Sequence, residues 1–193
     1  TIDRNLIIRT FAIIFTTTAI GGFIMRSTTF ALPKIFDERL TDIANSATLI
    51  GTYSFLVFAL AAFAQLVVGY LVDRYSVRLI FAFLAAMQAV FFVVMVNLTG
   101  PLALFISFGF MLMVFGQIPI NDVLVGRITR SEWRSRAYAL RYIITFTVAS
   151  TAVPLIAWIH TEWSFDILFT VMAIGATSTF ATVFFLPRAI ADS

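Results

Sequence analysis

Arg26 lies inside a long apolar stretch, where a charged side chain is unusual. A charge inside a bilayer costs about 2.5 kcal/mol or more on insertion scales, so it needs a carboxylate, backbone carbonyls or a water-filled cavity. Thr18 and Gly22 precede it at helical spacing and Thr29 follows, which predicts a polar, small-residue stripe along one helix. Two interpretations stay open. Arg26 contacts an anionic substrate or forms a gating ion pair, or its side chain snorkels to the nearby headgroups.

A second polar cluster interrupts a later apolar stretch. Gln117 and Asn121 are four residues apart and therefore share one face of a helix. Pro119 between them lacks an N–H, so it frees a backbone carbonyl and can kink the helix. Interrupted helices of this kind often line sites in membrane proteins. With Thr18, Gly22 and Arg26, these two amides are the candidate cavity residues.

Asp122 follows directly and is the acid nearest to the interior of any apolar stretch. A carboxylate there can carry a proton or pair with a cation such as Arg127 or Arg141. Its position close to the end of the stretch favours the ion pair.

The sequence offers little to an enzyme. His160 is the only histidine and stands beside Glu162 in a predicted turn, where a surface residue is expected rather than a metal ligand. There is no cysteine, no two-histidine site and no glycine-rich phosphate loop. We therefore expect no enzyme activity, no metal and no cofactor.

Six apolar stretches hold these residues. Each reaches the length of about 20 residues that a helix needs to cross the hydrocarbon core. Hydrophobic residues make up 61% of the 193 residues and charged residues only 12%, about half the usual share of a soluble domain. We expect an all-α integral membrane protein formed by a single six-helix bundle over residues 1–193. The predicted spans are 8–33, 47–72, 79–98, 101–125, 137–159 and 165–187.

Basic residues are concentrated on one side of these spans. An even number of crossings puts both ends of the chain and the second and fourth connections on the same face. By the positive-inside rule, both termini are expected in the cytoplasm, in a multi-pass protein of the plasma (inner) membrane. The opposite face carries Lys34 and Arg39. The ten basic residues of the arginine-rich face are Arg4, Arg9, Arg74, Arg78, Arg127, Arg130, Arg134, Arg136, Arg141 and Arg188.

The sequence pI of about 9.7 raises the possibility of a nucleic-acid partner. The basic residues are spread over membrane-edge connections, which suits membrane topology better. The lipid bilayer is therefore the expected partner and nucleic acid is not.

The second span ends in a distinctive run of residues at 69–78. Asp73 stands at the carboxy-terminal end of a helix, where the negative end of the macrodipole disfavours a carboxylate by a few tenths of a kcal/mol. A cation or the N-terminus of another helix would compensate it. Gly69 lies one turn earlier on the same face and would let another helix approach closely. The simpler alternative is a solvated, charged connection.

This run resembles the cytoplasmic signature loop of the major facilitator superfamily, with matches at Gly69, Leu71, Asp73, Arg74 and Arg78. Val72, Ser76 and Val77 depart from the pattern, as in degraded copies from the second half of such twelve-helix transporters. The run 132–137 resembles the entry to the family's eleventh helix, and Pro33 is placed as in many seventh helices.

The resemblance covers nearly the whole chain and implies six helices equivalent to a carboxy-terminal half, arranged as an inverted 3+3 repeat. It implies that the first and fourth spans line a substrate cavity, the second and fifth meet the other half, and the third and sixth face lipid. The list of gating candidates is Gly69, Asp73, Arg74, Arg78, Asp122 and Arg134.

The resemblance favours secondary active transport of a small solute by alternating access, with an amino-terminal six-helix half or a second copy as partner. That half belongs to the same parent chain or to a separate one. The alternative from another class is a non-transporting membrane scaffold or assembly factor on the same helices. Arg26 and its polar stripe favour transport.

Overall fold

The structure is a computed structural model that describes residues 4–129 and 132–186, and the side chains of 4–7 and 128 lie outside this description. Six helices account for nearly all of the described chain, and each is long and apolar enough to cross a membrane. The predicted all-α membrane fold is confirmed. The helices are α1 (Arg4–Arg39), α2 (Ala47–Val72), α3 (Val77–Met95), α4 (Pro101–Ile128), α5 (Arg134–Glu162) and α6 (Phe165–Val183).

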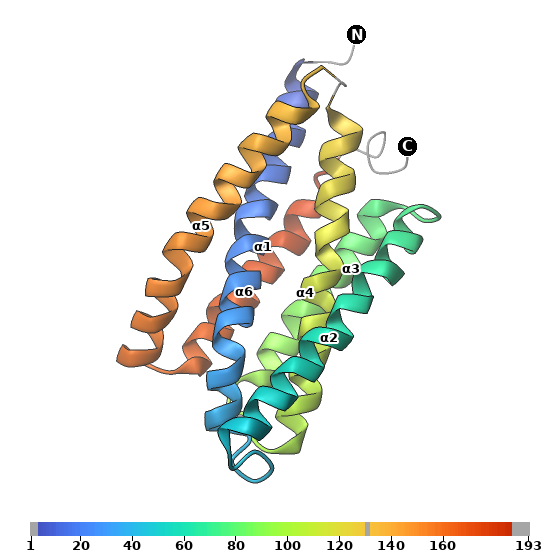
Figure 1. The fold of residues 1–193 in the computed structure, drawn as a ribbon. Coiled ribbons are helices and arrows are strands. Elements are labelled where there is room, and N and C mark those ends of the chain that lie inside the picture. Colours follow the sequence, from blue (N-terminus) through green and yellow to red (C-terminus); the bar gives the residue numbers. More distant parts are fainter. Residues whose placement is uncertain (1–3, 130–131, 187–193) are drawn as a thin grey trace.

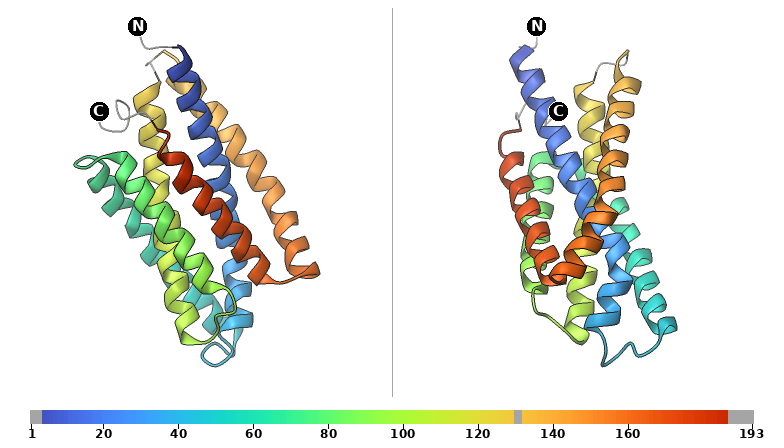
Figure 2. Two further views of the ribbon diagram at one scale, coloured as in Figure 1. Left: turned by 180° about the vertical axis from the view of Figure 1, so that it is seen from behind. Right: turned by 90° about the vertical axis from the view of Figure 1, so that its left-hand side faces the viewer.

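The helices run up and down in one bundle of two layers. In Figure 1, α5, α1, α4 and α2 lie in front, and Figure 2 shows α3 and α6 together on the other side. The α2–α3 connection, the end of α4 and the start of α5 lie at the same end as the start of α1, which we call the arginine-rich end. We call the other end the acidic end.

The packing has the symmetry of an inverted repeat. α2 packs mainly on α4, and α5 packs mainly on α1, so the middle helix of each triplet contacts the first helix of the other. α3 and α6, the last helices of the two triplets, pack on each other. Exchanging α1–α3 with α4–α6 therefore reproduces the same set of neighbours, as expected for a 3+3 arrangement.

Phenylalanines fill the contact between the two layers. Phe92 of α3, Phe110 of α4 and Phe169 of α6 are fully buried. Their ring centroids lie 5.2 to 6.3 Å apart in tilted pairs, within the range that favours aromatic contacts. This cluster holds α4 against the α3–α6 layer and so fixes the position of the helix that carries Gln117 and Asn121.

α2 and α5 are the most exposed helices of the bundle. Large apolar side chains such as Phe55 and Leu66 on α2 and Ile143 and Phe146 on α5 are open. Lipid or another protein surface must cover them, since apolar area of this extent is costly in water.

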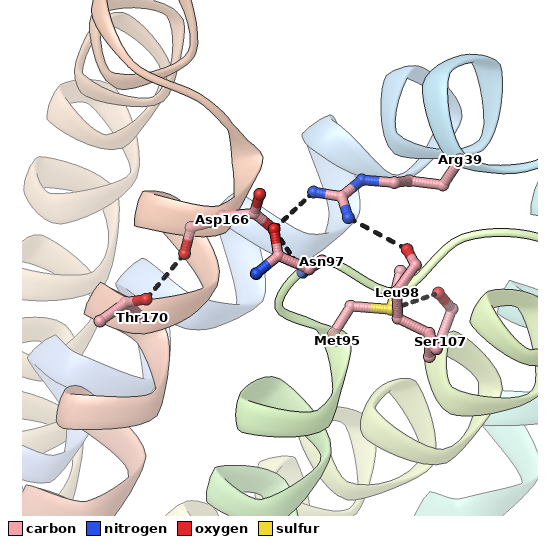
Figure 3. A network of polar contacts seen from close by, with 7 residues as sticks. All are labelled: Arg39, Met95, Asn97, Leu98, Ser107, Asp166 and Thr170. Carbon is pink, nitrogen blue, oxygen red and sulfur yellow. Dashed lines mark hydrogen bonds and ion pairs between the residues drawn. The ribbon is translucent and has the colours of Figure 1, made fainter.

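The acidic end is held by a polar network that joins α1, the α3–α4 connection and α6. Arg39 donates one hydrogen bond to Asp166 and another to the Leu98 carbonyl, as Figure 3 shows. The Asn97 backbone N–H also donates to Asp166. α1 continues past Pro33 to reach this network. In its last turns, Lys34 Nζ forms an exposed ion pair with Asp37 Oδ2 at 2.8 Å.

Candidate functional site

A cavity of about 200 Å³ lies between α1, α4 and α5, with one wall residue from α3, and apolar atoms form most of its wall. It contains four of the five residues that the sequence singled out as cavity candidates, namely Thr18, Gly22, Gln117 and Asn121. The other lining residues are Gly21, Met25, Gln88, Val114, Ile118, Asp122, Arg141, Tyr142 and Thr145.

The α4 wall carries an ordered set of amides. Gln117 donates a hydrogen bond of 3.0 Å from its Nε2 to Gln88 Oε1 on α3. Asn121 donates from its Nδ2 to the Gln117 backbone carbonyl at 3.2 Å. All three side chains are buried. These bonds fix the orientations of the buried amides.

Two glycines, Gly21 and Gly22, lie between Thr18 and Met25 in the α1 wall. A Cβ at Gly22 would lie 3.9 Å from Thr145 Cγ2 on α5, and a Cβ at Gly21 would lie 3.9 Å from Gln117 Oε1 on α4. Both distances are ordinary van der Waals contacts, so larger side chains would extend into the gaps between the helices. The small residues let α1 approach α4 and α5 closely.

Asp122 of α4 forms an ion pair with Arg141 of α5 across the cavity wall. The Tyr138 hydroxyl, one turn earlier on α5, donates to the Asp122 backbone carbonyl at 2.9 Å. Arg141 is therefore a partner of the carboxylate, one of the two that the sequence offered. The pair places two opposite charges side by side, so together they add no net charge to the cavity.

Arg26 does not line this cavity, although it lies one helical turn from Gly22 on α1. Its side chain is half-buried. Within the described part of the chain it makes no hydrogen bond or ion pair. The structure therefore supplies no partner for its charge from this bundle, and its role stays a prediction.

The signature residues lie at the arginine-rich end of α2. Asp73 is the C-cap of α2; its side chain is exposed and forms no ion pair with any described residue. Arg74 turns back over the Tyr70 ring, with its guanidinium carbon 4.2 Å from the ring centroid. A Cβ at Gly69 would meet no atom within 4 Å. The face that carries Gly69 and Asp73 is thus open in this chain.

The other two gating candidates contact neighbouring backbone. Arg78 donates to the Phe184 carbonyl at 2.7 Å and so joins the start of α3 to the end of α6. Arg134 donates to the Gly126 carbonyl at 3.4 Å and joins the start of α5 to α4. Both residues therefore stabilise the ends of helices on the arginine-rich side of the bundle. Neither residue lines the cavity.

One contact of the acidic end was missed by sequence reasoning. His160, in the last turn of α5, lies 2.8 Å from Glu38 Oε1 of α1 and packs on the Phe165 ring. No group of three potential metal-ligating side chains occurs in residues 4–129 and 132–186. His160 reaches Glu38 only because α1 packs on α5, and the spacing of residues in the sequence does not reveal that packing.

Comparison with known proteins places these features in a family. The model of the Major Facilitator Superfamily matches residues 11–192. No curated protein sequence matches the chain. A crystal structure of the peptide transporter POT in complex with sulfate superimposes with a TM-score of 0.80 at 15% identity, covering 91% of this chain and 37% of that one. The structure of a POT mutant in complex with alafosfalin gives a TM-score of 0.77 at 16% identity, with 90% and 37% coverage.

Proposed function

The chain belongs to the Major Facilitator Superfamily, and on that premise we propose that it works as the carboxy-terminal half of a secondary active transporter. Membrane transport is the activity that the family and the transporters of the same fold support. We assign to this chain the movement of a small solute by alternating access, in which two six-helix halves rock about a site near the bilayer midplane.

The observation that carries this proposal is the cavity that α4 borders with buried amides, although α4 runs as one continuous helix through Pro119. Gln117 and Asn121 are buried amides on one face of α4, and Gln117 binds the buried amide of Gln88 on α3. Ionisable residues inside a membrane are costly and mark substrate pathways, and Asp122 and Arg141 line the same cavity. A membrane scaffold would need no such cavity.

A second six-helix half is the proposed partner. The chain spans 37% of the length of the POT transporter chains to which it was compared. Exposed apolar side chains on α2 and α5 offer a surface for this partner. In the proposed assembly α2 and α5 contact the amino-terminal half or a second copy, and α3 and α6 face lipid. α1 and α4 line the cavity as the resemblance implies, and α5 contributes Arg141, Tyr142 and Thr145 to its wall.

The signature residues supply the proposed gate. Asp73 has an unfavourable place on its own helix, and the Gly69 face leaves room for a close approach. The positive N-terminus of a helix in the other half would compensate the Asp73 carboxylate in one of the two states. In this proposal the termini are cytoplasmic, so the gate closes the inner side of the plasma (inner) membrane.

Uptake into proteoliposomes that contain the protein with its complete set of helices tests the proposal. The variant pair Gln117→Leu and Asn121→Leu removes the amides of the cavity with little change in volume. Thr52→Val, an exposed site on α2, is the control. We expect loss of uptake in the cavity variants only. Absence of solute movement in the unmodified protein, with correct insertion, would favour the scaffold alternative.

A further inference from the structure

An apolar groove of about 660 Å³ lies between α2 and α3 and shares no lining residue with the cavity between α1, α4 and α5. α2 and α3 are joined by the short connection 73–76 but hardly contact each other along their length, because each packs on α4. Among the described residues that line the groove, Tyr75 alone has a polar side-chain group. The groove therefore suits a hydrocarbon chain rather than a polar solute, which would lose its hydrogen bonds there.

The groove has a closed floor and bulky walls. Val68 and Leu84 form its floor, where both are buried against α4. A Cβ added to Gly116 of α4 would lie only 3.0 Å from Val68 and 3.3 Å from Leu84. Phe63 of α2 and Phe83 of α3 are exposed in the two walls. A chain in this groove contacts α2, α3 and α4 together, which distinguishes it from lipid that touches the outside of one helix.

The length of the groove matches one leaflet of a bilayer. Its lining residues on α2 extend from Leu60, midway along this 26-residue helix, to Leu71 beside the arginine-rich end. At 1.5 Å per residue this distance is roughly 16 Å. The whole hydrocarbon core is about 30 Å thick, so the groove runs from the middle of the membrane to the headgroup level. Its mouth opens at the arginine-rich end.

An arginine and two tyrosines surround this mouth. Tyr75 lines the groove, and Tyr70 borders it because it follows Val67 by one turn on the same side of α2. Arg74 is exposed and lies over the Tyr70 ring, with its guanidinium carbon 4.2 Å from the ring centroid. Tyrosine favours the headgroup level, and a guanidinium can bind a phosphate through two parallel hydrogen bonds. The mouth thus offers a phosphate donor where the apolar groove ends.

The charges at the mouth favour a headgroup with a net negative charge. Arg78 adds a second positive charge at the start of α3, where it donates to the Phe184 carbonyl. Asp73, the acid of this connection, stands on the opposite side of α2 from Leu71, since two residues turn a helix by about 200°. A basic residue near an anionic lipid surface strengthens binding about fivefold, which corresponds to about 1 kcal/mol. An ammonium headgroup would instead meet charges of its own sign.

We propose that the groove between α2 and α3 is a binding site for an anionic phospholipid, with one acyl chain in the groove and the phosphate bound by Arg74. The face of α2 that carries Gly69 and Asp73, assigned above to the other half, lies about 200° around the helix from Val67 and Leu71. The lipid and the other half therefore fit on α2 together. Lipid binding requires no solute, so its test is independent of transport.

Photoreactive phospholipids test this site in the protein with its complete set of helices, placed in nanodiscs of phosphatidylcholine. Two probes carry the same diazirine-bearing acyl chain, one with a phosphatidylglycerol and the other with a phosphatidylcholine headgroup, at the same low mole fraction. Mass spectrometry maps the labelled residues. We expect the anionic probe to label the groove residues about fivefold more strongly than the zwitterionic probe, or more. Labelling of the exposed side of α6 should differ little between the probes.

Two variants, each with a matched control, make the test specific to this groove. Arg74→Gln removes the headgroup contact and should lower labelling by the anionic probe about fivefold. Arg136→Gln changes another exposed arginine that lies over an aromatic ring at the same end, and it should leave labelling unchanged. Ala64→Phe fills the groove and should lower labelling by both probes, whereas Ala181→Phe at an exposed site of α6 should not.

Equal labelling by the two headgroups, with no effect of Arg74→Gln, would show ordinary surface lipid only and would overturn the site. Groove residues that neither probe labels would show that protein covers the groove, which overturns the site as well. If Ala64→Phe does not fold, Arg74→Gln still decides, because it changes an exposed side chain. Loss of the lipid site in these experiments leaves the proposed transport untouched, and absence of uptake leaves the lipid site untouched.

Discussion

Arg39 and Asp166 lie 127 positions apart in the sequence, yet Arg39 Nη2 donates to Asp166 Oδ1 at 2.7 Å. The other guanidinium branch donates to the Leu98 carbonyl, and the Arg39 carbonyl accepts from the Gly100 N–H. One residue at the end of α1 therefore binds both the α3–α4 connection and the start of α6. Because it joins elements of both triplets, it helps the six helices to move as one body.

Removal of this arginine should loosen the acidic end. Arg39→Met keeps the aliphatic contacts but leaves Asp166 and the Leu98 carbonyl short of a donor, at a cost of about 1–3 kcal/mol. Asp166→Asn keeps an acceptor for the Asn97 N–H and should cost less. Thermal unfolding in detergent measures both.

Lys34→Met is the matched control, because the Lys34–Asp37 pair is exposed and such pairs contribute about 0–1 kcal/mol. If Arg39→Met is no less stable than Lys34→Met, the network does not hold the acidic end together.

The sequence predicts the helices more directly than it predicts the contacts between them. Hydropathy predicts the helices because the thickness of the bilayer sets a minimum length for each apolar stretch. Helical spacing also predicts that Gln117 and Asn121 share a face, since both lie on one helix. The Asp122–Arg141 pair was one of two candidates, because spacing alone does not say which cation the packing brings near.

Contacts between distant elements could not be predicted. The Arg39–Asp166 pair and the His160–Glu38 contact depend on how α1 packs on α6 and α5. Arg26 shows the opposite case, in which a sequence signal meets no partner in the described bundle.

Cysteine labelling tests the predicted topology. The excess of arginine at one end predicts that a cysteine at Ser76 or Ser135 is shielded from an impermeant reagent added outside, whereas one at Ser46 is labelled. Ser46 is exposed in the connection before α2, and Ser135 is exposed at the start of α5. Labelling at Ser76 in intact cells would reverse the orientation.

Asp73→Asn should change the balance of states rather than the fold. The carboxylate is exposed and makes no ion pair with the described residues, so its neutralisation removes little from this bundle. A coupling of a few kcal/mol to the other half is enough to move populations strongly. Cavity accessibility to cysteine reagents and uptake kinetics measure the shift, with Asp37→Asn at the exposed acidic end as control. Unchanged accessibility and kinetics would mean that 69–78 is an ordinary charged connection.

Arg26 tests whether the substrate carries a negative charge. It lies one turn from Gly22 and therefore just beyond the cavity, with no partner in the described bundle. If it faces the space between the halves, an anionic part of the substrate binds there. Arg26→Ala should then abolish transport of such a substrate although the protein still inserts.

Arg26→Lys separates charge from geometry. Lysine keeps the positive charge but cannot form the planar, two-pronged contact that a guanidinium makes with a carboxylate or phosphate. We therefore expect impaired recognition in Arg26→Lys at normal stability. Uptake or exchange in proteoliposomes is measured beside thermal unfolding, with Arg9→Ala near the start of α1 as the control. Full activity of Arg26→Ala at normal stability would show that the side chain only snorkels to the headgroups, and an anionic substrate would then have no support from this residue.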